Sequence, residues 1–273
     1  MPLLSSCIKT VTDRELPAPV EKLVVGAFLS PDDENIEVKI AKSFPPGSST
    51  SGEDYYVKDA DVVISNGEQE VTLNYYPMEQ TYMTTTSDLP IIPGKTYFLN
   101  VTTPSGLKAS SYTTVPKESV QNINISIDSS LIDSSAREPY YDVKVSIDWH
   151  SPEPTDHFKL RGDIASNYNS SYYYTSPSLF FGSHGSSLLV NDKQIANGKV
   201  GPFTSSFSKG IGESGKLIIT LYTIDEHYYQ YDEDLKNTFS GDPFSEPKNI
   251  HSNIEGGLGI FTSYRKHEFV KEW

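Results

Sequence analysis

Residues 210–216 read G-I-G-E-S-G-K, which approaches the phosphate-binding loop G-x-x-x-x-G-K-[ST]. Such a loop needs inward-facing backbone N–H groups, a Ser or Thr that holds Mg²⁺, and a helix that starts at once. Here Leu217 occupies the Ser/Thr position, and the apolar run at 217–224 predicts a buried central strand. The segment therefore predicts a strand-to-strand turn and not a nucleotide site.

The other residues that could do chemistry form no recognised catalytic constellation. The six histidines show neither H-x-H nor H-E-x-x-H spacing, and the chain has one cysteine, so we expect no zinc site. No G-x-S-x-G elbow occurs, and the acidic clusters do not follow a calcium-loop pattern. We therefore expect no catalytic residues, no metal and no cofactor. A hydrolase with two facing carboxylates stays open, with Asp148, Asp163 and Glu255 as its candidates.

The single cysteine, Cys7, follows Leu4-Ser5-Ser6, and this L-S-S-C string resembles the lipobox of bacterial lipoproteins. The polar, proline-bearing residues after it predict a tether, so residues 1–20 read as a lipobox-like segment and tether. Acyl chains on Cys7 would hold the protein at a membrane with about 0.8 kcal/mol per buried methylene. The alternative is an incidental thiol in a terminal segment. We expect lipidation, and anchoring rather than membrane spanning.

The composition describes an acidic chain built from strands. A length of 273 residues suits two domains, and a formal net charge of −14 argues against nucleic acid or anionic lipid as a partner. The 18 Tyr and 12 Phe accompany many Thr, Ser, Val and Ile residues, which favours short strands joined by turns. No apolar run approaches the length needed to cross a bilayer. We expect an all-β fold with one docked helix.

Residues 21–117 predict an immunoglobulin-like β-sandwich. Alternating apolar runs recur at short intervals, and turn-forming residues separate them. The strongest of these turns is Asn66-Gly67, which lies between two such runs and predicts a hairpin. Pro116-Lys117 marks the end of this predicted domain.

Residues 118–273 predict a larger β-sandwich or partial barrel that carries the helix. The run at 140–150 alternates as a half-buried strand does, and 158–164 is its predicted partner. Thr223 and Glu226 have capping-box spacing, and apolar residues at helical intervals follow them, which predicts a helix near 224–239.

A stretch rich in Tyr, Ser and Asn at 167–185 is the predicted loop for a ligand or partner. Tyrosine offers a large contact area at low entropic cost, and this composition is typical of binding loops. The alternative is an insertion whose aromatic side chains pack back on the sandwich. The candidate contact residues are Tyr168, Tyr172, Tyr173, Tyr174, Phe180 and Phe181.

Several motifs carry a family resemblance. Residues 226–239 read E-H-Y-Y-Q-Y-D-E-D-L-K-N-T-F, and residues 252–261 read S-N-I-E-G-G-L-G-I-F. Together with L-S-S-C and K-L-V-V-G-A-F-L-S-P at 22–31, they resemble a surface-lipoprotein family of Bacteroidota catalogued as domain of unknown function DUF 4249. The resemblance implies an outer-membrane lipoprotein, often encoded near TonB-dependent transporters, with no established enzymatic activity and no catalytic residues to carry over.

Within the last motif, Gly256, Gly257 and Gly259 predict a bulge or positive-φ turn and a close approach of backbones. We interpret Asn253 and Glu255 as structural partners of that turn and not as a site.

These observations predict a non-enzymatic, lipid-anchored protein of the outer membrane that faces the cell surface. Its expected role is that of an accessory or binding subunit of a TonB-dependent, SusC-like transporter or another outer-membrane β-barrel assembly. A free-standing cell-surface module that binds glycan or peptide is the alternative, and a hydrolase is the third hypothesis.

Overall fold

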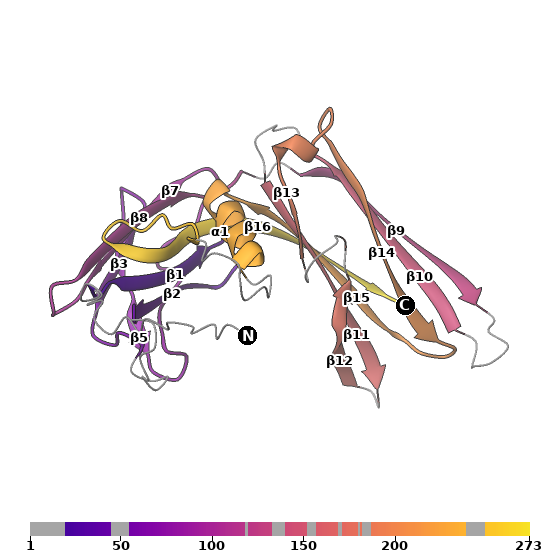
Figure 1. The fold of residues 1–273 in the computed structure, drawn as a ribbon, viewed down its shortest axis with the longest axis horizontal. Coiled ribbons are helices and arrows are strands. Elements are labelled where there is room, and N and C mark those ends of the chain that lie inside the picture. The colour runs from indigo at the N-terminus through magenta and orange to yellow at the C-terminus, as the bar shows by residue number, and fades with distance from the viewer. Residues whose placement is uncertain are drawn as a thin grey trace, which may run out of the picture.

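A computed structural model describes residues 20–44, 55–117, 120–132, 140–151, 157–168, 171–179, 181, 187–238 and 249–273. The described chain is mostly β-strand with a single α-helix, which confirms the all-β prediction. The strands form two lobes, and the helix lies where the lobes meet (Figure 1).

The first lobe is a sandwich of two sheets. Its strands are β1 (Leu23–Leu29), β2 (Asn35–Lys42), β3 (Asp61–Ser65), β4 (Glu70–Thr72), β5 (Asn74–Tyr76), β6 (Thr81–Thr85), β7 (Thr96–Thr102) and β8 (Lys108–Thr114). One sheet has the order β4-β3-β7-β8 and the other includes β1-β2-β6-β5. Alternate residues of β1 are buried between the two sheets, as a strand with one apolar face requires. The hairpin predicted at Asn66-Gly67 is confirmed, because β3 and β4 pair antiparallel around Gly67, whose φ is positive.

The second lobe is also a sandwich. Its strands are β9 (Gln121–Ile132), β10 (Tyr140–His150), β11 (His157–Tyr168), β12 (Ser171–Leu179), β13 (Ser187–Val190), β14 (Lys199–Gly210) and β15 (Gly215–Ile224). The three-stranded sheet β14-β10-β9 packs on β12-β11-β15, and β13 pairs with β11 next to a short 3-10 helix, η2 (Asp192–Gln194).

The predicted pairing of residues 158–164 with 140–150 is wrong. β11 pairs with β15, whereas β10 pairs with β9 and β14 in the opposite sheet. The two segments meet face to face, with the Trp149 and Phe158 rings 5.3 Å apart. Two strands with one apolar face each can bury those faces by packing across a sandwich as well as by pairing within a sheet, and alternation does not distinguish the two.

The glycine-rich segment at 210–216 is a turn, as predicted. It joins β14 in one sheet to β15 in the other, and Gly212 has a positive φ. The Gly210 N–H donates to the Glu213 carboxylate at 2.7 Å, so the turn is closed by its own side chain.

The long strand β16 (Gly257–Glu272) unites the two lobes. Residues 257–263 pair parallel with β1, and residues 264–272 pair antiparallel with β15. One sheet therefore runs through both lobes in the order β12-β11-β15-β16-β1-β2-β6-β5. The domain boundaries predicted from the sequence stay a prediction, but the C-terminal strand contributes to both predicted regions.

The helix α1 (Glu226–Thr238) begins two residues later than predicted, and Thr223 does not cap it. Thr223 lies within β15, paired with Phe158 of β11, so its chain direction is still that of a strand. Asp225 takes the capping role instead, because its carboxylate accepts the Tyr228 N–H at 2.7 Å.

Candidate functional site: a hollow over β1 and β2

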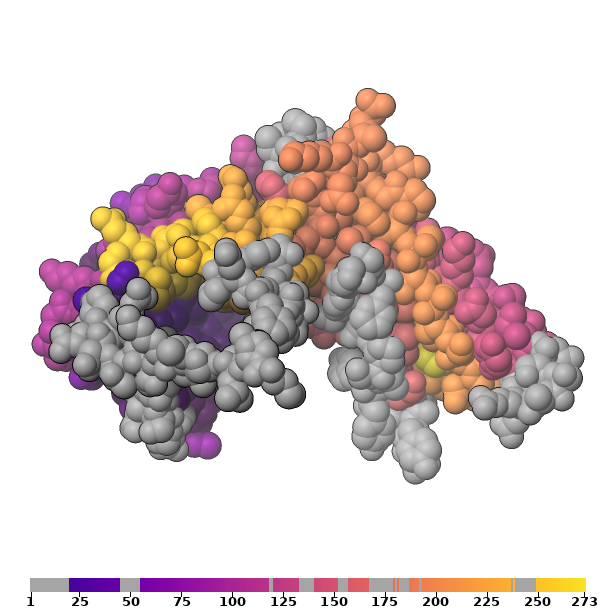
Figure 2. Space-filling model, in the orientation of Figure 1, coloured from indigo at the N-terminus to yellow at the C-terminus, as the bar shows by residue number. Residues whose placement is uncertain are grey.

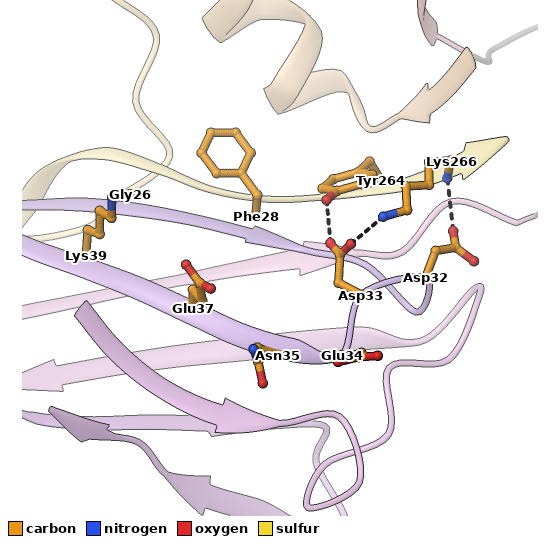
Figure 3. A pocket seen from close by; sticks show the side chains of 10 residues that line it. All are labelled: Gly26, Phe28, Asp32, Asp33, Glu34, Asn35, Glu37, Lys39, Tyr264 and Lys266. Carbon is orange, nitrogen blue, oxygen red and sulfur yellow. Dashed lines mark hydrogen bonds and ion pairs between the residues drawn. The ribbon is translucent and has the colours of Figure 1, made fainter. Parts of the chain in front are cut away.

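A hollow lies on the outer face of β1 and β2, beside β16 (Figure 3). Its volume is about 790 Å³, within the range of roughly 300–1,000 Å³ typical of ligand pockets. We call it the β1–β2 hollow, and its lining residues are Gly26, Phe28, Asp32, Asp33, Glu34, Asn35, Glu37, Lys39, Tyr264 and Lys266.

Gly26 keeps the floor of the hollow open. It lies in the middle of β1 with its outward side toward the hollow, and a Cβ atom there would meet nothing within 4 Å. Its φ is not positive, so neither packing nor backbone conformation requires glycine. Glycine in a strand interior costs roughly 0.5–1 kcal/mol relative to alanine. The residue is therefore best explained by the space that it leaves free.

The turn between β1 and β2 is fixed to β16 by two aspartates. Asp32 accepts the Lys266 backbone N–H at 2.9 Å and the Arg265 Nε–H at 3.0 Å. Burial alone would raise the pKa of Asp32, but the hydrogen bonds from Lys266 and Arg265 outweigh it and lower that pKa. Asp32 therefore stays ionised and holds one wall of the hollow in place.

Asp33 makes the second attachment. It accepts the Tyr264 hydroxyl and the Lys266 ammonium, the latter at 2.8 Å. Burial, and then the Asp33 carboxylate, raise the pKa of Tyr264 far above its ordinary value, so the phenol remains a donor. The hydrogen bond to Asp33 raises the pKa of Lys266 in turn. Figure 3 shows these three side chains converging at one end of the hollow.

Phe28 supplies an aromatic surface that α1 supports. Its ring centroid lies 5.1 Å from that of the Tyr228 ring on α1, and the residue is 38% exposed. The Lys159 ammonium lies 5.0 Å from the Tyr228 ring centroid and 2.6 Å from Asp232, in a pair whose side chains are less than one fifth exposed. The helix behind Phe28 is therefore held against β11 as well as β1.

Asp225 connects α1 to the sheet that carries the hollow. Its carboxylate accepts the hydroxyls of Thr113 and Thr262 and the backbone N–H of Ser263, besides the N–H of Tyr228 that begins the helix. One side chain thus joins β8, β16 and α1. The position of β16, which forms one wall of the hollow, is consequently determined by contacts between residues far apart in the sequence.

Three charged side chains of the hollow are free to meet a ligand. No hydrogen bond or ion pair within the described ranges engages the side chains of Glu34, Glu37 or Lys39. Two carboxylates, one ammonium and the Phe28 ring can accept hydroxyl or ammonium donors, donate one charged hydrogen bond and stack on an apolar face. This is an arrangement for binding a polar ligand.

The Tyr-rich prediction needs correction. The described residues up to Leu179 lie in strands and not in a loop, since Tyr168 ends β11, and Tyr172, Tyr173 and Tyr174 lie in β12, paired antiparallel with residues 165–167. Runs of Tyr and Thr have high strand propensity, and here that propensity decides the conformation.

Of the predicted residues Phe180, Phe181 and Cys7, the structure describes Phe181. Phe181 is 7% exposed and packs in the core of the second lobe, which agrees with the alternative that aromatic side chains of this stretch pack back on the sandwich. Gly162 on β11 makes room for it, because a Cβ there would lie 2.8 Å from the Phe181 ring. Phe180 and Cys7 lie outside the described residues.

The glycine segment brings two backbones together. Gly256 and Gly259 have positive φ, and a Cβ at Gly259 would collide with the Val25 carbonyl oxygen of β1. Asn253 exchanges two hydrogen bonds with the backbone of Phe261, at 2.7 and 3.0 Å. These contacts have a structural role, and none of them lines the hollow.

The carboxylates considered for hydrolysis do not meet. Asp163 lies on β11 in an ion pair with Arg161 at 2.7 Å, and Asp148 lies on β10 in the opposite sheet and accepts a hydrogen bond from Asn124. Glu255 lies in the first lobe, where its backbone pairs with Ser110 of β8. Within the described parts of the chain, no group of three His, Cys, Asp or Glu residues could hold a metal ion.

The acidic run Asp32-Asp33-Glu34 follows no sequence pattern of a binding site, so the hollow was not predicted. Asp33 and Tyr264 are 231 residues apart, and no local pattern indicates their contact. The one available signal was Gly26, a glycine inside the otherwise strand-forming run LVVGAFL.

No helix among the described residues is long and apolar enough to cross a membrane. No curated protein matches the chain. A family described as "Domain of unknown function (DUF4249)" matches residues 9–269. Because this match covers almost the whole length, the chain belongs to the DUF4249 family.

Proposed function

We propose that this protein is a non-catalytic binding protein, held at the outer membrane by a lipid on Cys7 and facing the cell surface. It acts as an accessory or binding subunit of a TonB-dependent, SusC-like transporter or of another outer-membrane assembly. The β1–β2 hollow is its binding surface.

The observation that carries the proposal is the hollow with its glycine floor. A strand interior favours β-branched residues, yet Gly26 leaves space that the fold does not use. Within the part of the chain that the structure describes, the charged side chains around it are either fixed by β16 or without a partner, so the surface is preorganised at one end and open at the other.

The membrane part of the proposal rests on the L-S-S-C string at residues 4–7 and on the family resemblance. The net charge of −14 supports a partner that is neither nucleic acid nor anionic lipid.

A second candidate is a free-standing module for glycan or peptide. The exposed Phe28 ring beside the unpaired carboxylates of Glu34 and Glu37 favours it, since aromatic faces and carboxylates together bind sugar rings and cationic side chains.

The test is purification of the full-length tagged protein from detergent-solubilised outer membranes, with mass spectrometry of Cys7 and of co-purifying proteins. Gly26→Val fills the hollow with a residue that strands favour, and Val24→Ile, on the same face of β1 outside the hollow, is the matched control. We expect acylated Cys7, a β-barrel protein in near-equal amount, and loss of that protein or of its cargo with Gly26→Val alone.

Each part of the proposal can fail separately. Absence of acyl chains on Cys7 overturns the membrane anchor. An acylated protein recovered alone, with saturable binding on a glycan or peptide array that Gly26→Val abolishes, favours the free-standing module. Equal behaviour of Gly26→Val and Val24→Ile in every assay would exclude the hollow as the binding surface.

A further inference from the structure

The strand β9 has an open edge of unusual length. It is the last strand of the sheet β14-β10-β9, and among the described strands ten of its 12 residues pair with β10 and none with any other strand (Figure 1). An unpaired edge presents a row of free N–H and C=O groups to any extended chain that approaches. Figure 2 shows β9 and β10 on the outer flank of the second lobe.

Most of the other edge strands in the described chain carry features that prevent such pairing. β12 contains Pro177, and β14 contains Pro202 together with two lysines. β4 and β5 are three residues long, and β8 is bridged at Ser110 by Glu255. Prolines, lysines, short length and a covering segment are the usual protections of a sheet edge.

β9 has none of these protections. Its sequence, QNINISIDSSLI, contains no proline, lysine or arginine, and Asp128 is its one charged residue. The single irregularity of its pairing lies near the first residues, so Asn124 to Ile132 present a regular edge. Leu131 and Ile132 at the far end are 54% and 37% exposed.

An apolar slot opens directly beside this edge. Its volume is about 210 Å³, below the range of roughly 300–1,000 Å³ for small-molecule sites, so it suits a side chain better than a whole ligand. We call it the β9 slot, and its lining residues are Ile125, Leu217, Ile219, Phe269, Val270 and Lys271.

The slot exists because the two facing layers differ in width. The sheet of β9 has three strands, whereas the opposite layer has β12, β11, β15 and the second half of β16. Phe269 of β16 is only partly buried against the core, and Val270 is 54% exposed. A fourth strand added to β9 would extend the narrower layer toward this uncovered part of β16.

We propose that the β9 edge binds an extended segment of a partner protein as an additional strand, with an aliphatic side chain of that segment in the β9 slot. A free edge supplies backbone hydrogen bonds, and an adjacent pocket selects alternate side chains, which is how proteins bind peptides by strand addition. The segment has apolar residues at alternate positions and no proline. This inference rests on the proposed function for the source of the partner but uses a surface separate from the hollow.

The fold offers a matched pair of positions for the test. Ser126 on β9 and Thr204 on β14 both lie opposite Ser146 of the central strand β10, one at each edge of the sheet, and both are exposed. A photoreactive benzoylphenylalanine at Ser126 or at Thr204, in whole cells that produce the full chain, reports what lies beside each edge.

We expect an adduct at Ser126 that maps to one segment of another protein with alternating apolar residues, and none at Thr204. Amide exchange in β9 should slow by roughly tenfold or more in the purified complex relative to the free protein, with β14 unchanged. Ser126→Lys should remove this protection, because a lysine at an edge blocks strand pairing, whereas Thr204→Lys should not.

No adduct at Ser126, equal adducts at both positions, or an adduct only with a second copy of this chain would overturn the proposal. An adduct that maps to a helical or proline-containing segment would do the same. The result does not depend on the hollow, since Gly26→Val can leave the Ser126 adduct intact. Absence of acyl chains on Cys7 would overturn only the proposed membrane anchor.

Discussion

The two halves of β16 differ in residue type, in the direction of their strand pairing and in burial. Residues 257–263 contain glycines, pair parallel with β1 and become fully buried from Ile260 onward. Residues 264–272 carry charged side chains, pair antiparallel with β15 and are mostly exposed or half-buried. In the first half, Gly259 lets the backbone of β16 approach β1 closely. In the second half, ion pairs to the β1–β2 turn hold the strand in place. The comparison shows that one strand can use two separate means of setting its position.

The largest effect should come from the first half. Gly259→Ala places a Cβ against the Val25 carbonyl and forces alanine into a positive φ. We expect a loss of about 3 kcal/mol or more in the free energy of unfolding, measured by urea denaturation followed by tryptophan fluorescence. Gly212→Ala is the control, because its φ is also positive but its Cβ would meet nothing, and it should cost only about 1 kcal/mol. Equal losses in both variants would contradict the role of the close approach.

The junction of the two halves comes next. Asp225→Asn keeps the shape of the side chain but places an amide group where the carboxylate accepts hydroxyl and N–H donors from three elements. We expect a loss of about 2 kcal/mol, seen as a lower Tm by calorimetry.

Asp88→Asn is the control for Asp225, because Asp88 also accepts threonine hydroxyls but is exposed and bonds only to neighbours in the sequence. Its Tm should change little. If the two variants shift the Tm alike, Asp225 is not the node that joins β8, β16 and α1.

The second half should respond to pH. The pKa of Asp32 is lowered in the folded protein, so its contribution to stability is complete above its ordinary pKa near 3.8 and is lost as the pH falls through the lower folded value. Asp32→Asn should remove about 1 kcal/mol or less at pH 7 and should flatten that part of the acid dependence. Urea denaturation of both proteins across an acid pH series measures how the free energy of unfolding depends on pH. An unchanged slope in the variant would show that Asp32 does not anchor β16.

The smallest effect should have the opposite sign. Gly26, which pairs with Ile260 in the first half of β16, has open space where Gly259 has none. Gly26→Ala should therefore stabilise the protein by about 0.5 kcal/mol, since alanine restricts the unfolded chain without a clash. Denaturation by urea alongside Gly259→Ala gives the comparison directly, and a destabilised Gly26→Ala would mean that the glycine serves the fold and not the hollow.

The sequence predicts features that depend on neighbouring residues. The Asn66-Gly67 hairpin, the turn at 210–216, the buried run at 217–224 and the presence of one helix all follow from local chemistry. The helix starts two residues later than predicted, and the predicted cap is wrong. Asp225 and Thr223 are both good capping residues, and the position at which β15 ends decides between them.

The sequence does not predict which strands become neighbours. Alternation identifies the apolar face of β11 but not whether β10 lies beside it or across from it. The hollow depends on the same kind of information, because Asp32 and Asp33 become walls only when β16 reaches them from the other end of the chain. The Tyr-rich stretch shows the complementary error, since a composition typical of binding loops is also one that forms strands.

The pairing of β1 with β16 has a consequence for the order of events during synthesis. β1 emerges before β2 to β15, but its second neighbour, β16, emerges only after them, with contacts such as Tyr264 to Asp33 spanning 231 residues. Contacts of such long range slow folding. Until β16 has been made, β1 therefore pairs on one side only, with β2, and the nascent first lobe keeps an open sheet edge for that time.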